Sequence, residues 1–104
     1  MSKKYYFVYI LCNKYKTVLY VGITNDLSRR LTEHSSHMVN SFCTKYRCRY
    51  LVHYEKFDDV NLAINREKQI KKSGRKAKIQ LIEKYNPDWT FLNELITRVD
   101  KEFL

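Results

Sequence analysis

The sequence predicts an α+β fold in which a small three-stranded antiparallel sheet is flanked by helices. Two runs of alternating residues near the N-terminus are separated by a short polar stretch, which is typical of a β-hairpin. A third extended run follows in the middle of the chain, and apolar residues at helical spacing occupy most of the second half. The 104 residues suit a single domain, and nothing in the sequence indicates a repeat or a linker.

The predicted strands cover residues 5–12, 18–23 and 50–57. The first two form a hairpin around the polar residues between them. If Leu11 pairs with Val18, Tyr9 lies opposite Tyr20 on the same face of the hairpin. The pattern therefore predicts that the two phenols are neighbours.

Four helices are predicted, running from the start signal Thr24-Asn25-Asp26 to about residue 35, and over residues 59–72, 76–85 and 88–104. Asp58 or Asp59 caps the second, and Pro87 ends the third. Residues 36–47 are polar and without a clear period, so they are predicted to be a loop.

The chain has 20 basic and 11 acidic residues and a net charge of +9. Such an excess predicts attraction to a polyanion, and nucleic acid is the commonest partner of this kind. A protein that is basic without a polyanionic partner is the alternative. No apolar run approaches the ~20 residues that span a bilayer, and the N-terminus lacks the apolar core of an export signal. We therefore expect a cytoplasmic protein with no membrane partner.

The three cysteines do not indicate a disulfide framework, because their number is odd and no export signal precedes them. Cys12 falls on the aliphatic face of its strand and is expected in the core. A zinc site is the competing interpretation, since His34, His37, Cys43 and Cys48 lie within 15 residues. Their order and spacing do not fit the regular structural zinc motifs, so we do not expect one.

The second predicted helix contains a carboxylate where the pattern asks for an aliphatic residue. Its apolar stripe consists of Val60, Ala63, Ile64, Glu67 and Ile70. A carboxylate turned toward a core costs several kcal/mol unless it is paired or binds a metal. Glu67 is therefore either a metal ligand or the partner of a nearby Lys or Arg.

The first predicted helix places Arg30 and His34 on one face, because they are four residues apart. Arginine can hold a phosphate with two parallel hydrogen bonds, and histidine can exchange a proton near neutral pH. Solvated Arg and His are common on helices, and most tyrosines pack in or around a core. Taken together with Tyr9, Tyr20 and Glu67, however, they form a candidate site.

These residues resemble the GIY-YIG nuclease superfamily. Phe7-Val8-Tyr9 and Tyr20-Val21-Gly22 resemble its name motif, with the two tyrosines 11 positions apart. Residues 22–31 and Glu33-His34 continue the likeness, and residues 65–72 look like the helix that bears the metal-binding glutamate. The chain is most similar to the small stand-alone bacterial members. It is also similar to the N-terminal nuclease domain of the bacterial excinuclease, to homing endonucleases and to flap- or junction-cutting nucleases.

The resemblance implies a GIY-YIG nuclease core at residues 5–85, with residues 86–104 as a helical extension packed on it. It also implies a role for each candidate residue. Tyr9 or Tyr20 takes a proton from water with help from His34, and Arg30 holds the scissile phosphate. Glu67 holds a single Mg²⁺ or Mn²⁺.

The sequence departs from the family pattern at a few positions. Phe7 replaces the first glycine of the name motif, and valine replaces isoleucine at Val8 and Val21. Many members keep an asparagine after the metal glutamate; Asn86 is the nearest later candidate, but it falls beyond the expected position. No additional DNA-binding module follows the core, so a protein partner that supplies substrate choice fits this sequence.

We therefore expect a metal-dependent endonuclease that acts on DNA rather than RNA, selects structure more than sequence, and serves repair or recombination. The residues expected to track the nucleic-acid backbone are Arg29, Arg66, Lys68, Lys71, Lys72, Arg75, Lys76 and Lys78. A solvated helix face is the other explanation of these charges. The alternative functions are a nucleic-acid-binding module that no longer cuts, and an adaptor that uses its last helix. The oligomeric state is left open.

Overall fold

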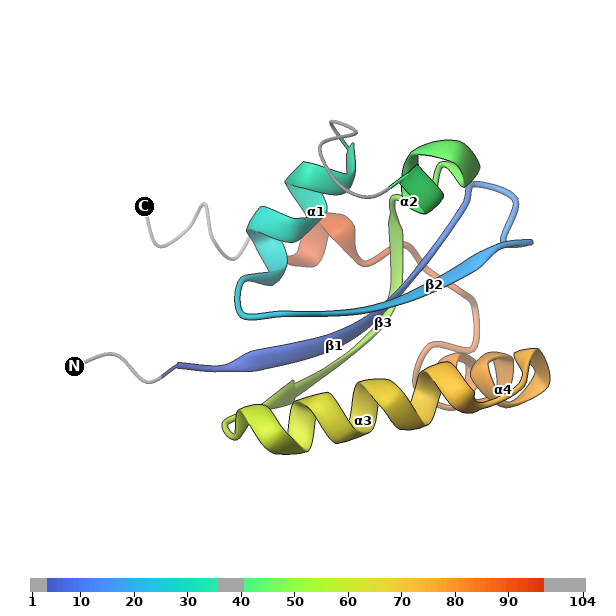
Figure 1. The fold of residues 1–104 in the computed structure, drawn as a ribbon. Coiled ribbons are helices and arrows are strands. Elements are labelled where there is room, and N and C mark those ends of the chain that lie inside the picture. The colour runs from blue at the N-terminus through green and yellow to red at the C-terminus, as the bar shows by residue number, and fades with distance from the viewer. Residues whose placement is uncertain (1–3, 36–40, 97–104) are drawn as a thin grey trace.

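The computed structural model describes residues 4–35 and 41–96, and it shows an α+β fold with a three-stranded antiparallel sheet (Figure 1). The strand order is β2-β1-β3, and helices lie on both faces of the sheet. In chain order the elements are β1 (Tyr6–Cys12), β2 (Leu19–Thr24), α1 (Leu27–Ser35), α2 (Ser41–Tyr46), β3 (Tyr50–Phe57), α3 (Val60–Lys72) and α4 (Arg75–Tyr85). The predicted fold class is confirmed.

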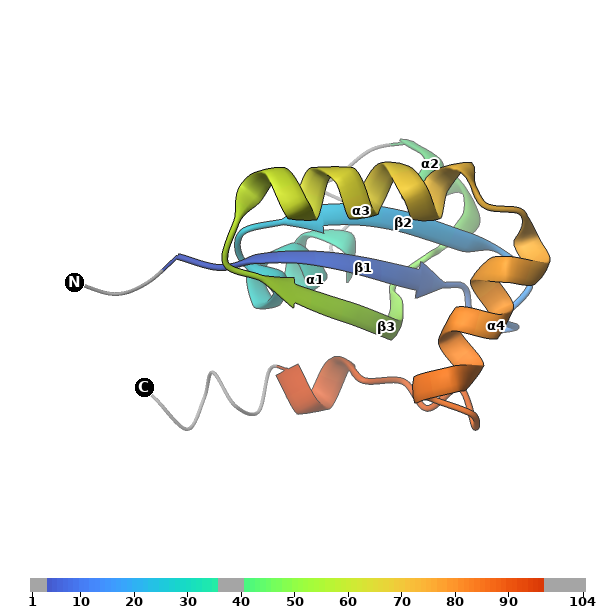
Figure 2. The same ribbon diagram turned by 90° about the horizontal axis from the view of Figure 1, so that it is seen from below.

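Each face of the sheet carries its own hydrophobic cluster, because successive strand residues point to opposite sides. The first cluster joins Val8, Ile10 and Cys12 of β1 to α3 and α4, through Ala63 and Ile82 among others. The second joins Tyr9 and Leu11 to α1 and α2. Helix α3 crosses one face while α1 and α2 lie on the other (Figures 1 and 2). Cys12 is fully buried, as expected.

The predicted hairpin register is wrong by two residues. Leu11 pairs with Tyr20 instead of Val18, and Tyr9 pairs with Gly22. The side chain of Asn13 causes the longer turn, since its amide oxygen accepts hydrogen bonds from the backbone of Thr17 and Val18. Because side chains alternate with a period of two, this shift leaves Tyr9 and Tyr20 on the same face as diagonal neighbours.

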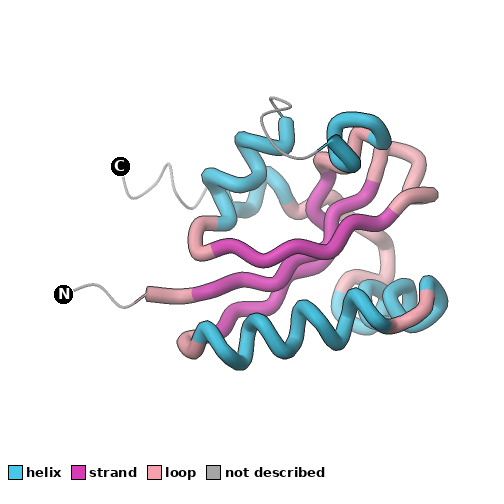
Figure 3. Tube along the Cα trace, in the orientation of Figure 1, coloured by secondary structure: helices cyan, strands magenta, loops and turns pink. Residues whose placement is uncertain are grey.

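The segment between α1 and β3 is only partly a loop. Residues 41–46 form the short helix α2, which the prediction of a loop over residues 36–47 missed (Figure 3). Cys43 is its buried contact with the second cluster. Since no second buried residue repeats at helical spacing among the described side chains of α2, the sequence gives no signal for this helix.

Helix α3 begins at the predicted cap, where the carboxylate of Asp59 accepts hydrogen bonds from the backbone of Asn61 and Leu62. Fewer residues of α3 are buried than the predicted apolar stripe contains. Val60 and Ile64, expected inside, are 39% and 37% exposed. Glu67 lies between the buried turns of the helix, and its side chain is 15% exposed.

The chain after α4 covers the free edge of β3 (Figure 2). The backbone of Leu92 donates to the carbonyl of Leu51, and the Asn93 amide bridges the backbone on either side of Tyr50. The helix predicted from residue 88 begins at residue 93 instead, and residues 97–104 lie outside the described part. The division into a core and an extension stays a prediction. In the described part of the chain, no helix is long and apolar enough to cross a membrane.

Candidate active site

Tyr9 and Gly22 form the centre of the candidate site. They are cross-strand partners in β1 and β2, and the Tyr9 ring lies directly over Gly22. A Cβ at residue 22 would overlap the ring and hydroxyl of Tyr9. Because residue 22 has no side chain, the phenol of Tyr9 can extend across the edge strand β2. Only 2% of the surface of Tyr9 is exposed.

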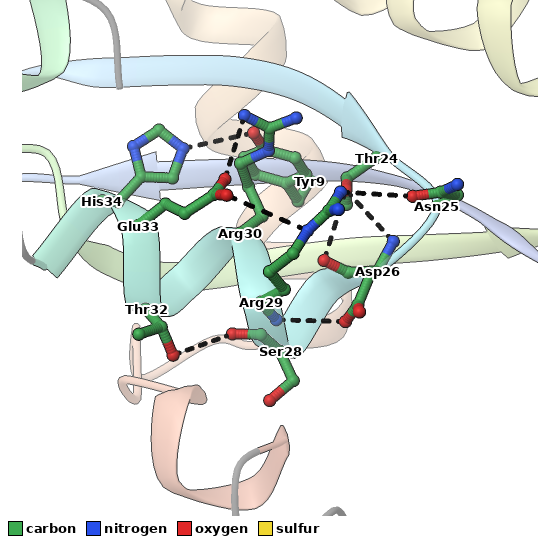
Figure 4. Close-up of polar contacts among 10 residues, drawn as sticks. All are labelled: Tyr9, Thr24, Asn25, Asp26, Ser28, Arg29, Arg30, Thr32, Glu33 and His34. Carbon is green, nitrogen blue, oxygen red and sulfur yellow. Dashed lines mark hydrogen bonds and ion pairs between the residues drawn. The ribbon is translucent and has the colours of Figure 1, made fainter. Parts of the chain in front are cut away.

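Helix α1 brings His34 to the hydroxyl of Tyr9, and the two side chains share a hydrogen bond of 3.2 Å from Oη to Nε2 (Figure 4). Tyr20 closes the group: its ring centroid lies 6.4 Å from that of Tyr9 and 5.6 Å from that of His34. Leu27 and Leu31 anchor α1 in the second cluster, and this packing fixes the position of His34.

Arg30 lies one turn before His34 and turns part of its guanidinium inward. One terminal nitrogen, NH1, is 3.3 Å from the carboxylate of Glu33 (Figure 4). Within the described residues, Nε of Arg30 and Nδ1 of His34 are buried without a hydrogen-bond partner. A buried unpaired donor is costly, so such atoms mark a place where a polar ligand is accommodated.

Burial dominates the protonation of both groups. It raises the pKa of the Tyr9 phenol above its ordinary value; the charges of Tyr20 and Glu67 add to this, and that of Arg30 opposes it. Burial and then the charge of Arg30 lower the pKa of His34 to about 4, against the weaker effect of Glu33. At neutral pH the pair is therefore a neutral phenol and a neutral imidazole.

Glu67 approaches from the helix on the opposite face of the sheet. Its carboxylate is 3.5 Å from the ammonium of Lys71, which is half exposed. Glu67 lies close enough to Tyr9 for its charge to affect the pKa of the phenol. The charges of Tyr20, Arg30 and Glu67 thus all act on Tyr9, which shares a hydrogen bond with His34.

The basic residues expected to bind nucleic acid differ in their surroundings. Arg66 is held by Glu55 and Gln69, with its Nε 2.8 Å from Glu55. The ammonium of Lys78 donates to the carbonyl of Ser73. Arg29 reaches Glu33 and Asn25 from an exposed position. The remaining members of the set are exposed, namely Lys68, Lys71, Lys72, Arg75 and Lys76.

The alternative zinc site gains no support in the described part of the chain, where no three His, Cys, Asp or Glu side chains gather around one point. Cys43 and Cys48 are buried in the second cluster, and His37 lies outside the described residues.

Sequence reasoning quoted Gly22 as part of a motif but missed its function. Only the observed register shows that the ring of Tyr9 needs the space above it. The correct pairing of Tyr9 with Gly22 would have been the signal, because an aromatic residue commonly covers a cross-strand glycine in a sheet.

The model of the GIY-YIG catalytic domain family matches residues 5–86. The chain belongs to the GIY-YIG family. The matched range includes all five residues of the candidate site and both helices that carry its charged members. It is therefore a member of a nuclease family, as the sequence resemblance implied.

Relatives of similar length are known from bacteria and archaea. A UPF0213 protein of Syntrophus aciditrophicus is 46% identical over 85% of this chain and 98% of its own length. Another, from Haloquadratum walsbyi, is 38% identical over 76% and 88% of the two chains. The solution NMR structure of a UPF0213 protein from Bacillus halodurans is similar with a TM-score of 0.54 and 28% identity, over 88% of this chain and 96% of that one. Their names state no activity.

Proposed function

We propose that this protein is an endonuclease that hydrolyses phosphodiester bonds in DNA with one divalent cation. The observation that supports this most is the hydrogen bond between Tyr9 and His34 beside the unpaired Nε of Arg30. It joins a proton donor, a proton acceptor and a phosphate-binding cation in one partly buried place. Phosphodiester hydrolysis needs these three elements.

The proton path runs from water to Tyr9 and from Tyr9 to His34. Both groups are neutral, and in the tautomer that carries its proton on Nδ1 the imidazole of His34 accepts the O–H of Tyr9 at Nε2. As the phenol oxygen accepts a proton from the attacking water, its own proton passes to His34, and no free phenolate has to accumulate. Tyr9 is favoured over Tyr20 as the base because it has this bond to His34.

Arg30 couples phosphate binding to this proton transfer. Its charge is one of the causes that lower the pKa of His34. A phosphate bound to the guanidinium offsets that charge, so His34 becomes a stronger base once the substrate is in place. Arg30 also stabilises the extra negative charge that develops on the phosphate during attack.

Glu67 fits a single divalent cation. Its carboxylate is largely sheltered, and its neighbour Lys71 lies on the exposed side of the helix. Mg²⁺ and Mn²⁺ commonly take one or two protein carboxylates and complete their shell with water and substrate phosphate oxygens, which agrees with a lone carboxylate here. Such an ion would supply charge neutralisation at the leaving oxygen.

Five exposed residues of the basic set support a substrate held by its backbone: Lys68, Lys71, Lys72, Arg75 and Lys76. Contacts of this kind carry no sequence information, so we expect the shape of the DNA to decide where it is cut. We further propose that the protein acts in DNA repair or recombination in the cytoplasm, with a partner protein that supplies substrate choice.

The test is cleavage of labelled flaps, forks, junctions, single strands and duplexes with Mg²⁺, Mn²⁺ or EDTA. We expect metal-dependent cutting that Glu67→Gln and Arg30→Ala each reduce on the order of 100-fold or more. Lys84→Ala, an exposed lysine of α4 outside the proposed site, is the matched control and should cut like the parent. Salt-sensitive binding without cutting under any metal would refute the enzyme and leave a binding module.

A further inference from the structure

A cavity lies at the end of the sheet, between the β1–β2 turn and the entry into β3. Its volume is about 290 Å³. It is lined by three tyrosines and three cationic side chains, Tyr15, Tyr46 and Tyr50 with Lys14, Arg47 and Arg49, together with Asn13. No lining residue is acidic, so the cavity is suited to an anion that also carries a flat ring.

The tyrosines are arranged for contact with a ligand. Tyr15 and Tyr46 are 77% and 40% exposed, which is unusual for side chains of this size. Tyr50 is held in place by stacking on Phe91, with centroids 4.4 Å apart, and forms a fixed wall. Exposed aromatic rings beside positive charges are the common means of binding unpaired nucleotides, since bases stack on the rings and phosphates meet the cations.

A row of aromatic rings connects this cavity to the proposed catalytic site. The centroid of Phe42 lies 6.0 Å from that of Tyr20 and 4.8 Å from that of Tyr46. Phe42 is 41% exposed, so the row lies along the surface. Lys45 adds a cation beside it, with its ammonium 5.4 Å from the centroid of Tyr46. A nucleic-acid strand leaving the catalytic site along this row therefore reaches the cavity.

Arg47 occupies a backbone position that a basic residue adopts at a cost. Its φ is 56°, in the left-handed region where glycine and asparagine are most at ease. An arginine at this bend directs a cation to the rim of the cavity. This agrees with a functional use of the side chain, because the turn itself does not need it.

We propose that this cavity binds an unpaired nucleotide of the strand whose phosphate occupies the catalytic site. Its base stacks on Tyr46 or Tyr15, and its phosphate contacts Arg47 and Lys14. A base inside a duplex has no free face for such stacking, so the cavity selects substrates with a single-stranded branch. The inference rests on the proposed function, because the nucleotide in the cavity belongs to the strand that the enzyme would cut. Binding of single-stranded DNA to the cavity can nevertheless be measured without cutting.

The first experiment measures anisotropy of a labelled single-stranded 12-mer of thymidine with the full chain in EDTA. Tyr46→Leu should weaken binding about tenfold, and Tyr46→Phe, which keeps the ring, should stay within about twofold of the parent. Arg47→Asn, which suits the left-handed backbone, should lower the salt dependence by about 0.7 in the slope of log K against log salt. The matched controls are Tyr85→Leu and Lys84→Asn on α4, and both should bind like the parent.

Two outcomes overturn the proposal. Parental affinity in Tyr46→Leu and Arg47→Asn, with melting curves that show folded proteins, would mean that the strand passes elsewhere. Competition by free thymidine monophosphate as strong as that of the 12-mer would make the cavity a site for small nucleotides. Neither outcome depends on cleavage activity.

A cleavage assay then separates this proposal from the proposed function. We expect Tyr46→Leu to lower cutting of a flap or fork severalfold and to leave the slower cutting of a blunt duplex unchanged. If the parent cuts no substrate while Tyr46→Leu still loses single-strand binding, the endonuclease proposal fails and the nucleotide cavity stands. Equal losses on branched and blunt substrates would contradict the branch-binding function.

Discussion

The ring of Tyr9 lies over Gly22 in the neighbouring strand and fills the space that a side chain at residue 22 would occupy. A Cβ there would overlap Cζ and the hydroxyl oxygen of Tyr9 and would lie 2.9 Å from Cε2. Because Tyr9 is almost fully buried, its ring has little room to move aside. The glycine of the second half of the name motif therefore has a steric function in this protein: it seats the phenol against His34.

Gly22→Ala should therefore act on the site more than on the fold. We expect at least a tenfold loss of kcat/KM for cleavage, because the Oη of Tyr9 is pushed away from Nε2 of His34, and a destabilisation of about 1–3 kcal/mol. Cleavage kinetics and thermal melting measure the two effects. Gly74→Ala is the control, since a Cβ at residue 74 meets nothing within 4 Å and should not affect cutting. Equal losses in both variants would contradict the steric explanation.

The pH dependence of cleavage should show the lowered pKa of His34. Since that pKa is about 4 in the folded protein, the imidazole stays neutral and able to accept a proton down to mildly acidic pH. We expect kcat/KM of the free enzyme to fall on the acid side with an apparent pKa near 4, well below the ordinary value of about 6.5. Initial rates in constant-ionic-strength buffers measure this. An acid limb centred at pH 6.5 that His34→Gln abolishes would contradict the burial argument.

The same shift makes His34 a source of acid sensitivity. The unfolded chain binds a proton at His34 below about pH 6.5, but the folded chain does so only below about pH 4. Stability is therefore highest above pH 6.5 and declines as the pH falls toward 4, by up to roughly 3 kcal/mol from this residue. Urea unfolding of the parent and of His34→Gln at several pH values isolates this contribution. Curves that stay parallel between pH 6.5 and 4 would exclude it.

The strands, and the common face of Tyr9 and Tyr20, could be predicted because their patterns are local. Residues 50–57 alternate clearly and form β3 over that range. The register of the hairpin was wrong, because it depends on the side-chain hydrogen bonds of Asn13 in the turn. The predicted register differs from the observed one by an even number of residues, so Tyr9 and Tyr20 still lie on the same face of the sheet. The predicted proximity of Tyr9 and Tyr20 is therefore correct although the predicted register of the hairpin is wrong.

Features that depend on tertiary contacts could not be predicted. The helical pattern identified Glu67 as turned inward, but not that its charge and that of Arg30 both act on Tyr9. Among the described side chains of helix α2, Cys43 alone is buried, so the helix has no detectable period. The aromatic row through Phe42 depends on how α2 packs beside β2, which no local pattern encodes.

Two basic residues of α3 are expected to have different functions: Arg66 stabilises the fold, and Lys68 binds nucleic acid. Arg66 donates from Nε and NH2 to the two carboxylate oxygens of Glu55, at 2.8 and 3.0 Å, whereas Lys68 is exposed. Burial alone would raise the pKa of Glu55, but the hydrogen bonds from Arg66 and His53 outweigh it and hold that pKa below its ordinary value. Arg66 thus holds α3 against β3.

Arg66→Ala should lower the free energy of unfolding by about 1–3 kcal/mol, because it leaves a sheltered carboxylate with fewer partners. Lys68→Ala should leave stability within about 0.5 kcal/mol of the parent and lower the salt slope of duplex binding by about 1. Each change removes one positive charge, so the pair is matched. Chemical denaturation and a salt titration of DNA binding supply the data. A larger stability loss in Lys68→Ala than in Arg66→Ala would show that the contacts have been assigned wrongly.

Asn86 is expected to stabilise the fold without taking part in the reaction. Its amide donates to the carbonyls of Val52 and Thr90, at 3.0 and 2.9 Å, and its oxygen accepts from the backbone of Thr90. These bonds fasten the turn after α4 to β3, on whose edge the following chain lies. Exposed strand edges are liable to pair with other chains, so this attachment also protects the sheet.

Asn86→Ala should therefore lower the free energy of unfolding by about 2–3 kcal/mol, which corresponds to a Tm lower by on the order of 10 °C for a domain of this size. Cleavage per folded molecule should be unchanged well below that Tm. Asn61→Ala, at an exposed position of α3, is the matched control and should not lower the Tm. Family members often keep an asparagine after the metal glutamate, so the opposite result is informative. A large loss of kcat at an unchanged Tm would show that Asn86 takes part in the reaction.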